Sequence, residues 1–370
     1  MSLVAGGECH VGLMSGTSLD GVDGVLCMVR DGRWHTQAHA HRPFPAALRQ
    51  SLMALNTSGP DELHRAALAS QALAVLYAEV VQAVCEQAQV LPSEVRAIGA
   101  HGQTVRHRPE LGYTLQLNQP ALLAELTGID VVADFRSRDV AAKGQGAPLV
   151  PAFHEAMFAQ PDRTVAVLNI GGMANLSILR PGHGPLGFDC GPGNALLDMW
   201  CLQHTGRAYD ADGEWGAQGT VRDDWLAGAL AEPFFALAPP KSTGRDLFNA
   251  DWLTRWLKPH AGGSAQDVQA TLCELTAHSA AQAVKDHAPD ATELVVCGGG
   301  ALNGDLMRRL ARQLPRVRVC RSDEHGLGVM QVEAAAFAWL AWAHVHRVPG
   351  NLPAVTGARG PRVLGALYPA

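Results

Sequence analysis

The sequence predicts an α/β protein of two lobes that arose by duplication of one unit, with a central cleft between them. Three observations support this prediction. The chain has 370 residues, which is longer than one ordinary core, because domains usually span about 100–200 residues. A strand, a glycine-rich turn and a second strand occur near the start and again near the middle. An alanine-rich helical segment and a further strand follow in each half.

The first copy opens at residues 10–13, which are apolar and lead into a small polar turn at residues 14–21. A second apolar run follows at residues 22–29, so the pattern is that of a strand, a turn and a strand. Residues 63–89 are rich in alanine and predict a long helix. Residues 95–100 predict a buried strand that ends in a polar loop.

The second copy repeats this order. Residues 165–170 and 176–179 predict two strands, and residues 171–175 predict the turn between them. A helix is expected over residues 268–287. The strand that follows, residues 293–297, ends in three successive glycines before a basic helical segment.

The boundary between the lobes is expected near residue 147, so that the lobes are residues 1–147 and 148–370. Glycines and prolines interrupt regular structure there, at Gly144, Gly146, Pro148 and Pro151. The helix that begins near residue 331 is a candidate for packing back onto the first lobe.

Composition excludes several classes of protein. Apolar residues make up 47% of the chain and charged residues 17%, so the whole chain can fold. A net charge of -6 gives no basic surface for nucleic acid or an anionic membrane. Residues 334–345 are apolar but shorter than the about 20 residues that span a bilayer, and the start has no secretion signal. The eight cysteines are dispersed singly, which favours a reducing, cytoplasmic location.

Closely spaced histidines raise the possibility of a metal site. His35 and His39 would lie about 13 Å apart on one face of an extended strand, too far to share an ion. The sequence contains no HExxH motif. We therefore expect no metal site held mainly by the protein.

The glycine-rich turns are the first candidate binding sites. The turn at residues 15–21 lacks the lysine of a P-loop and leads into a strand, which also excludes a Rossmann fingerprint. Glycines and hydroxyls in a hairpin can nevertheless cradle phosphate, because backbone N–H groups approach the oxygen atoms closely. A plain hairpin turn is the alternative, and the second hairpin favours the phosphate interpretation.

Two further segments could carry chemistry. Asp189 lies in a glycine-rich bend before a predicted helix at residues 195–204, with Asn194 as the expected N-cap and helix-terminal N–H groups nearby. Asp189 is either a catalytic base or the centre of a structural turn, and the paired hairpins favour catalysis. Gly298, Gly299 and Gly300 permit flat contact between backbone and a planar ring or phosphate.

Together, the hairpins and the late glycine loop look like the actin, hexokinase and Hsp70 superfamily of ATP-using proteins, with its ribonuclease H-like, actin-like fold. Seven segments, in order along nearly the whole chain, resemble the anhydro-N-acetylmuramic acid kinase family. They are GLMSGTSLDGVD, AHGQTVRHRP, DFRSRDVAAKGQGAPLVP, LNIGGMANLS, GFDCGPGNALLD, PPKSTGRDLFN and GNLPAVTGARG. Lys143 departs from the glycine expected within the third segment.

The resemblance implies an unusual kinase reaction. The family hydrolyses the 1,6-anhydro bridge of a muramic sugar and phosphorylates the freed 6-hydroxyl with ATP, during bacterial cell-wall recycling. The resemblance further implies ATP and Mg²⁺ as cofactors, with Mg²⁺ held largely by phosphates and waters, and a cytoplasmic homodimer. Neither nucleic acid nor a membrane is an expected partner.

The resemblance also implies site residues. Asp189 would be the general base. Contacts with ATP are expected from Gly16, Thr17, Ser18, Leu19, Asp20, Gly21, Val22, Asp23, Gly171, Gly172, Asn175, Gly298, Gly299 and Gly300. Contacts with the sugar are expected from Gln103, Thr104, Asp134, Arg136 and Glu333.

Several of these residues have structural alternatives. Arg136 could bind the lactyl carboxylate of the sugar in a fork, or could pair with Asp134 or Asp139. Gln103 and Thr104 could merely cap a loop, and Glu333 could merely favour a helix N-terminus. For the whole chain, the alternatives are an ordinary sugar kinase acting on a free hydroxyl and a sensor of nucleotide and sugar without turnover.

Overall fold

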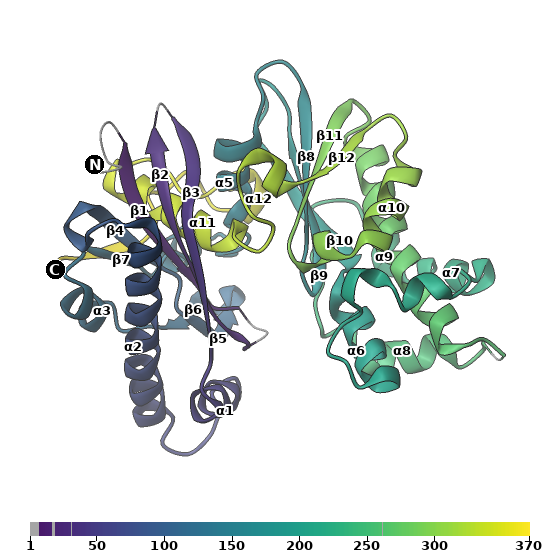
Figure 1. Cartoon of the computed structure of the whole chain (residues 1–370), viewed down its shortest axis with the longest axis horizontal. Helices are drawn as coiled ribbons and strands as arrows, with labels where there is room; N and C mark the ends of the chain where they lie inside the picture. The colour runs from purple at the N-terminus through teal and green to yellow at the C-terminus, as the bar shows by residue number, and fades with distance from the viewer. Residues whose placement is uncertain (1–6, 17–18, 31, 261) are drawn as a thin grey trace. The chain divides into compact units, whose positions relative to one another are not determined.

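The computed structural model describes residues 7–16, 19–30, 32–260 and 262–370 (Figure 1). The chain forms two compact units. Unit 1 comprises Met1–Phe153 and Gln331–Ala370, and unit 2 comprises His154–Met330. The division thus falls a few residues after the expected position of 147, and the last part of the chain belongs to unit 1.

Unit 1 is built on a mixed sheet with the strand order β3-β2-β1-β4-β7-β13. The first three strands are antiparallel neighbours, β4 and β7 run parallel to β1, and β13 is antiparallel to β7. The strands are β1 (Glu8–Met14), β2 (Gly21–Arg30), β3 (Arg33–Pro43), β4 (Val95–Ala100), β7 (Val131–Ala133) and β13 (Ala366–Tyr368), and a separate hairpin comprises β5 (Gln103–Arg108) and β6 (Tyr113–Leu117).

Helices cover both faces of this sheet. The long helix α2 (Glu62–Ala88) packs on β2 and β3, and α11 (Val332–Val345) packs on β1 and β4. Shorter helices are α1 (Ala46–Ala54), α3 (Pro120–Thr127), α4 (Ser137–Ala141) and α12 (Pro353–Thr356), and α5 (Val150–Phe158) spans the division between the units. The most apolar part of α2 is long enough to cross a membrane, but 56% of it is buried within the fold, as in a core helix.

Unit 2 repeats the architecture of unit 1. Its sheet has the order β10-β9-β8-β11-β12, with β8, β9 and β10 antiparallel and β11 and β12 parallel to β8. These strands are β8 (Thr164–Ile170), β9 (Met173–Leu179), β10 (Leu186–Pro192), β11 (Ala291–Cys297) and β12 (Arg318–Arg321). The strands β8, β9, β10, β11 and β12 correspond in position and direction to β1, β2, β3, β4 and β7 of unit 1, in that order. The predicted α/β duplication is confirmed.

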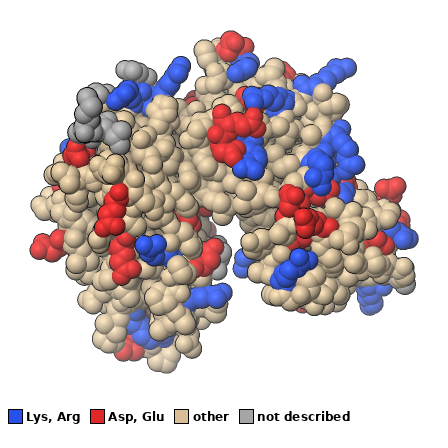
Figure 2. All heavy atoms as spheres, viewed as in Figure 1, with Lys and Arg blue, Asp and Glu red and all other residues tan. Residues whose placement is uncertain are grey.

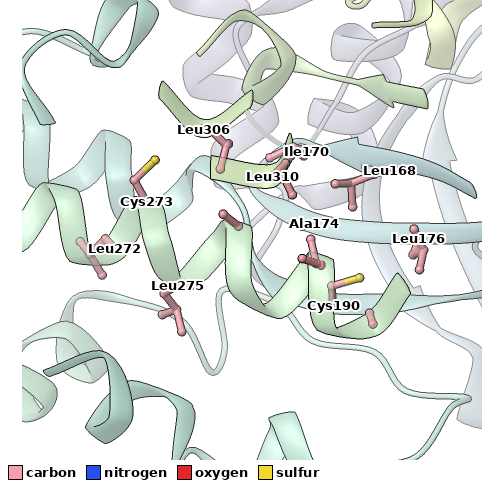
Figure 3. Close-up of a cluster of buried hydrophobic side chains, with 14 of the residues drawn as sticks. Leu168, Ile170, Ala174, Leu176, Cys190, Leu272, Cys273, Leu275, Leu306 and Leu310 are labelled. Atoms are coloured by element: carbon pink, nitrogen blue, oxygen red, sulfur yellow. The ribbon is translucent and has the colours of Figure 1, made fainter. Parts of the chain in front are cut away.

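The core of unit 2 lies between its sheet and two helices (Figure 3). Leu168, Ala174 and Cys190 come from β8, β9 and β10, and Leu272 and Leu310 come from the facing helices. The helices of this unit are α6 (Asn194–Thr205), α7 (Asp223–Leu230), α8 (Ala250–Leu257), α9 (Ala265–His287) and α10 (Gly304–Gln313). Short 3-10 helices occur at Pro92–Glu94, Pro109–Leu111, Ala211–Gly213, Gly216–Gln218, Pro233–Ala236, Gly299–Leu302 and Ser322–His325.

Two local predictions need correction. The turn between β8 and β9 is confined to Gly171 and Gly172, because β8 ends at Ile170 and β9 already begins at Met173. Asn194 is not the N-cap of α6. Gly193 takes that position, and the Asn194 side chain instead donates a hydrogen bond to the carbonyl of Ile170 at 3.2 Å. Lys143 adopts a φ of 70°, the left-handed conformation that glycine favours.

Charged side chains of both signs occur over each unit on the face shown in Figure 2. This mixture agrees with the small net charge of -6. On this face neither unit presents a broad basic surface of the kind that nucleic acid requires.

Two strand glycines allow α11 to contact the sheet of unit 1 through its backbone. A Cβ atom at Gly12 would overlap the carbonyl oxygen of Ala334, and one at Gly99 would overlap that of Phe337. We expect Gly12→Ala and Gly99→Ala each to lower the free energy of unfolding by about 1–3 kcal/mol, because the helix must move away. Chemical denaturation measures this change.

Gly184→Ala is the matched control, because a Cβ there would meet no atom within 4 Å. Unfolding energies within about 0.5 kcal/mol of wild type for all three variants would contradict this packing.

Candidate functional site

The first hairpin of unit 1 joins β1 to β2. Gly16 accepts hydrogen bonds at its carbonyl from the Leu19 amide at 3.3 Å and from Gln103 Nε2 at 3.1 Å. Leu19 is buried with a φ of 56°, and Asp20 is exposed. Gly21, Val22 and Asp23 belong to β2. Thr17 and Ser18, which were expected to contact ATP, lie outside the described residues.

A buried tyrosine joins the hairpin to the loop that follows β4. The Tyr77 hydroxyl lies 3.1 Å from Ser15 Oγ and accepts a hydrogen bond from the Gly102 amide at 3.1 Å. Ser15 Oγ also donates to the Gly102 carbonyl at 3.2 Å. Burial raises the pKa of Tyr77 far above its ordinary value, so the hydroxyl stays neutral. This network fixes the start of the first hairpin relative to the loop.

Asp23 has two histidine partners from the neighbouring strand. Its Oδ1 lies 2.9 Å from His39 Nε2 and 3.3 Å from His41 Nδ1. The sequence had indicated that His35 and His39 are too far apart to share an ion, but it did not reveal this role for His39. Asp23, which was expected to contact ATP, is therefore a carboxylate that is paired with two histidines.

Gln103 and Thr104 differ in their surroundings. Gln103 is 1% exposed, and while its Nε2 binds Gly16, its buried Oε1 has no hydrogen-bond partner among the described residues. Thr104 is half-buried, and its hydroxyl accepts from Gln116 Nε2 at 3.2 Å. Gln103 thus holds the first hairpin through its amide nitrogen and presents an unsatisfied acceptor.

The Arg136 guanidinium is held by His101 and a backbone carbonyl. Its Nε and Nη2 each donate to His101 Nε2 at 3.0 Å, and Nη1 donates to the Gly146 carbonyl at 2.8 Å. Desolvation and the neighbouring guanidinium lower the pKa of His101 well below its ordinary value. The imidazole is therefore neutral and protonated at Nδ1, close to the carbonyls of Ser15 and Gly102 but without a well-aligned hydrogen bond.

Arg136 keeps two donors for a ligand. Three of the five guanidinium N–H groups make the bonds to His101 and Gly146, which leaves one on each terminal nitrogen. Burial lowers the pKa of Arg136 to about 10, with Glu333 and Asp139 opposing the shift, so the group remains charged at neutral pH. N–H groups of a guanidinium are donors that a carboxylate accepts readily.

Neither aspartate named as an alternative partner hydrogen-bonds Arg136. Asp139 is buried and accepts from the Gly146 amide, Asn351 Nδ2 and Thr356 Oγ1 at 2.8, 2.6 and 2.8 Å. It therefore ties the loop after α4 to the segment near α12. Asp134, expected to contact the sugar, is exposed and adopts a φ of 59°.

Glu333 lies in the first turn of α11. Its side chain keeps solvent access, yet the surrounding protein raises the pKa of its carboxyl above the ordinary value. Arg136 opposes this rise, while Asp23 and Asp20 add to it. The structure thus brings four of the expected residues of unit 1 into electrostatic contact.

Asp189 of unit 2 lies on β10 where the strand leaves regular pairing. Its backbone faces Asn175 of β9, and the register shifts before Gly191. The loop of residues 241–243 fixes it, because the Asp189 amide donates to the Lys241 carbonyl at 3.0 Å and Oδ2 accepts from the Thr243 amide at 2.9 Å. Burial raises the pKa of Asp189, and the Thr243 hydrogen bond opposes the rise.

The second hairpin is capped by the start of α6. The Gly171 carbonyl accepts from the Asn194 amide at 2.8 Å, and the Gly172 carbonyl accepts from the amides of Gly193 and Ala195 at 2.9 and 3.1 Å. The amides of residues 193–195 are therefore occupied by carbonyls of the second hairpin.

The glycine loop after β11 packs tightly against β8. Gly298 has a φ of 78°, and a Cβ there would lie 2.6 Å from the Ile170 carbonyl oxygen. A Cβ at Gly300 would overlap the Ile170 side chain. Gly299 is half-buried and less constrained. Gly298 and Gly300 therefore have a structural reason to be glycine, independent of any ligand.

Sequence reasoning missed several polar groups of unit 2. Thr243 has a buried hydroxyl with no hydrogen-bond partner among the described residues. Lys241 Nζ lies 4.7 Å from the ring centroid of Phe234, and burial lowers its pKa. Burial raises the pKa of Asp198 to about 6, with Arg245 opposing the shift. All three lie in segments that carried the family resemblance, which was the available signal.

Comparison with known proteins gives a consistent result. A protein-family model described as anhydro-N-acetylmuramic acid kinase matches residues 8–370. A protein of that description from Variovorax paradoxus strain S110 is 60% identical over 373 residues, which cover 98% of this chain and 100% of the relative. Another, from Bordetella petrii, is 60% identical over 368 residues, which cover 98% and 97%.

Solved structures resemble the chain more distantly. The activator of the 2-hydroxyisocaproyl-CoA dehydratase from Clostridium difficile with bound ADPNP is 14% identical and has a TM-score of 0.46. The match covers 92% of this chain and 96% of that chain. This likeness is too distant to indicate a function. The actin-like α/β fold is evident from the matching strand orders of the two units.

The raised pKa of Asp189 predicts a pH-dependent effect on stability. A carboxyl with a raised folded-state pKa stabilises the fold when protonated and loses that contribution as pH rises through the folded-state pKa. Asp189→Asn removes the cost of burying the ionised carboxylate at higher pH. We therefore expect the unfolding free energy of Asp189→Asn, relative to wild type, to be higher at about pH 7 than at about pH 3.5. Urea titrations at both pH values measure it, and an opposite trend would contradict the assigned pKa direction.

Proposed function

The chain belongs to the anhydro-N-acetylmuramic acid kinase family, and we propose that it opens the anhydro ring hydrolytically, with Asp189 as the base, as it phosphorylates the sugar. As a member of the family it is an ATP-using kinase of a cell-wall amino sugar.

The observation that supports this proposal most directly is the environment of Asp189. A general base must be ionised yet retain affinity for a proton, and it must be fixed within about 2.6–3.2 Å of the water it activates. Asp189 is half-buried, its pKa is raised, and one carboxylate oxygen is held by the Thr243 amide. The other oxygen, Oδ1, is then available to a water molecule.

Ring opening and phosphoryl transfer occur together in the proposed reaction. Asp189 takes one proton from a water molecule, whose oxygen bonds to the anomeric carbon while the bond from that carbon to O6 breaks. The electron pair released to O6 attacks the γ-phosphorus of ATP, and ADP leaves. The phosphoryl transition state spreads charge over its oxygens, which backbone N–H groups and metal can stabilise.

The nucleotide is assigned to the two hairpins and the glycine loop. Glycines in both hairpins allow backbone to approach phosphate, and the loop at Gly298–Gly300 lies against β8. Mg²⁺ supplies charge neutralisation when bound with the phosphates, and the Asp20 carboxylate is an oxygen ligand of the type this ion prefers.

The sugar is assigned to residues of unit 1. Arg136 would bind the lactyl carboxylate through its two remaining terminal N–H groups. Gln103 Oε1, Thr104, Asp134 and Glu333 are acceptors that suit sugar hydroxyls and the amide N–H.

We also propose a cytoplasmic location. All eight cysteines are free and buried, which suits a reducing cytoplasm. A homodimer is proposed from the family resemblance.

Loss of the base should slow turnover strongly while leaving the fold intact. We expect Asp189→Asn to lower kcat by about 10²- to 10⁴-fold, the usual contribution of general-base catalysis. The control is Asp224→Asn, an exposed carboxylate at the start of α7, which should retain wild-type activity. A coupled assay of ADP release with anhydro-N-acetylmuramic acid measures both. Retention of activity by Asp189→Asn would remove Asp189 from the mechanism.

Arg136 should discriminate between sugars by their lactyl group. We expect Arg136→Lys to raise KM for anhydro-N-acetylmuramic acid by about 10- to 100-fold, because a fork of charge-assisted bonds is lost. KM for anhydro-N-acetylglucosamine, which lacks the lactyl carboxylate, should change much less. The control is Arg138→Lys, a conservative change at an exposed position of α4. Equal effects of Arg136→Lys on both sugars would assign Arg136 a structural role only.

A further inference from the structure

Unit 2 contains a cluster of three potential metal ligands outside the proposed catalytic residues. Glu293 is on β11, Cys320 is on β12, and His325 ends the 3-10 helix that follows β12. Glu293 pairs with Arg318 in the parallel ladder, so Cys320 lies two residues farther along β12 on the same face of the sheet. The 3-10 helix then returns His325 to this face. One ligand atom of each residue lies within 4.8 Å of the others.

The separations between these ligand atoms suit a small ion. Cys320 Sγ lies 3.4 Å from Glu293 Oε1 and 3.8 Å from His325 Nε2, and the last two atoms are 3.3 Å apart. Zinc bonds of about 2.0–2.3 Å to sulfur, nitrogen and oxygen in tetrahedral geometry place neighbouring ligand atoms about 3.3–3.6 Å apart. The three ligand atoms therefore need to move by only a few tenths of an ångström.

The cluster also contains an unsatisfied acceptor. Glu293 is 3% exposed, and its Oε2 is buried without a hydrogen-bond partner among the described residues. Its Oε1 accepts from Arg318 Nη1 at 2.7 Å, but Arg318 is 60% exposed and can remain on Glu324, which its Nη2 contacts at 2.7 Å. A carboxylate with one unpartnered buried oxygen is costly and is the kind of group that a cation stabilises.

We propose that Glu293, Cys320 and His325 bind a zinc ion. Thiolate, imidazole and carboxylate together favour zinc over magnesium or calcium, which prefer oxygen ligands alone. The His325 side chain is 22% exposed and provides the entry side, so a water molecule completes the four ligands. On binding, the Cys320 thiol releases its proton to solvent as the sulfur bonds to the metal.

The ion would link three successive elements of unit 2. It would join β11, β12 and the helix Ser322–His325, and so would restrain the segment that leads to Val329. The Val329 carbonyl accepts a hydrogen bond from the Gly298 amide at 2.8 Å, so the restrained segment also supports the glycine loop. Zinc should therefore raise the thermal stability of the protein, and the rise should grow with the logarithm of the zinc concentration above Kd.

Cobalt(II) titration of the full-length, reduced, chelator-treated protein tests this proposal, because Co²⁺ replaces Zn²⁺ and absorbs visible light. We expect one Co²⁺ per chain, with intense four-coordinate d–d bands and a thiolate-to-cobalt charge-transfer band, both removed by added Zn²⁺ and unchanged by excess Mg²⁺. His325→Gln should weaken the apparent Co²⁺ affinity by at least about 10- to 100-fold. Cys320→Ser should remove the charge-transfer band.

Cys201→Ser is the matched control, since Cys201 is a buried thiol that contacts Thr205 rather than the cluster. It should bind Co²⁺ as wild type does. The wild-type titration decides even if a variant fails to fold, because absence of the thiolate band there overturns the proposal. Persistence of that band in Cys320→Ser, or its loss in Cys201→Ser, also overturns it. The spectra involve neither ATP nor sugar, so the result does not depend on the proposed kinase mechanism.

Discussion

Direct contact between the backbone of α11 and the sheet is the constraint on which unit 1 depends. Gly12 and Gly99 carry no Cβ, so the carbonyls of Ala334 and Phe337 can approach β1 and β4. The first turn of the same helix holds Glu333, whose carboxyl interacts electrostatically with Arg136, Asp20 and Asp23. Close packing of α11 is thus what brings Glu333 near charged residues from the first half of the chain.

Two charged groups, Arg136 in unit 1 and Asp189 in unit 2, are held by neutral or backbone partners. His101 is kept neutral and accepts from Arg136, and Asp189 is held by a backbone amide rather than by a cation. A salt bridge would compensate the charge of these groups, so that they would bind a ligand less well. Neutral partners orient the groups and leave their charge to interact with a ligand. Burial without a cationic partner disfavours the ionised form of Asp189, and the raised pKa of its carboxyl reflects this cost.

The sequence was sufficient to predict the class of fold. Repeated hairpins, helices and strands indicated a duplicated α/β chain. The bounds of the helices predicted at residues 63–89 and 268–287 agree within a few residues with those of α2 and α9. The strand order could not be predicted, because it depends on pairing between segments distant in sequence. Asn194 shows the limit of predicting a helix cap from local sequence preference. It suits an N-cap by propensity, but its side chain reaches Ile170 on β8, a tertiary contact that overrides the preference.

Site residues were predicted by type more readily than by partner. The resemblance singled out Arg136 and Asp23, but it could not show that His101 holds the former and His39 the latter. Tyr77 lies in an alanine-rich helix as one apolar residue among many, and its role depends on Ser15 and Gly102 from two other segments. The Glu293, Cys320 and His325 cluster likewise depends on strand register, which spacing along the sequence does not give.

Mass spectrometry of the product formed in H₂¹⁸O tests the central claim most directly. If a water activated by Asp189 opens the anhydro ring during phosphoryl transfer, the 6-phosphorylated sugar carries one solvent ¹⁸O at the anomeric carbon from its first appearance. Fragmentation should place that label on the anomeric carbon and none on the phosphoryl group, in product trapped before exchange. A phosphorylated sugar without solvent oxygen would contradict hydrolytic ring opening and would indicate a kinase that acts on a free hydroxyl.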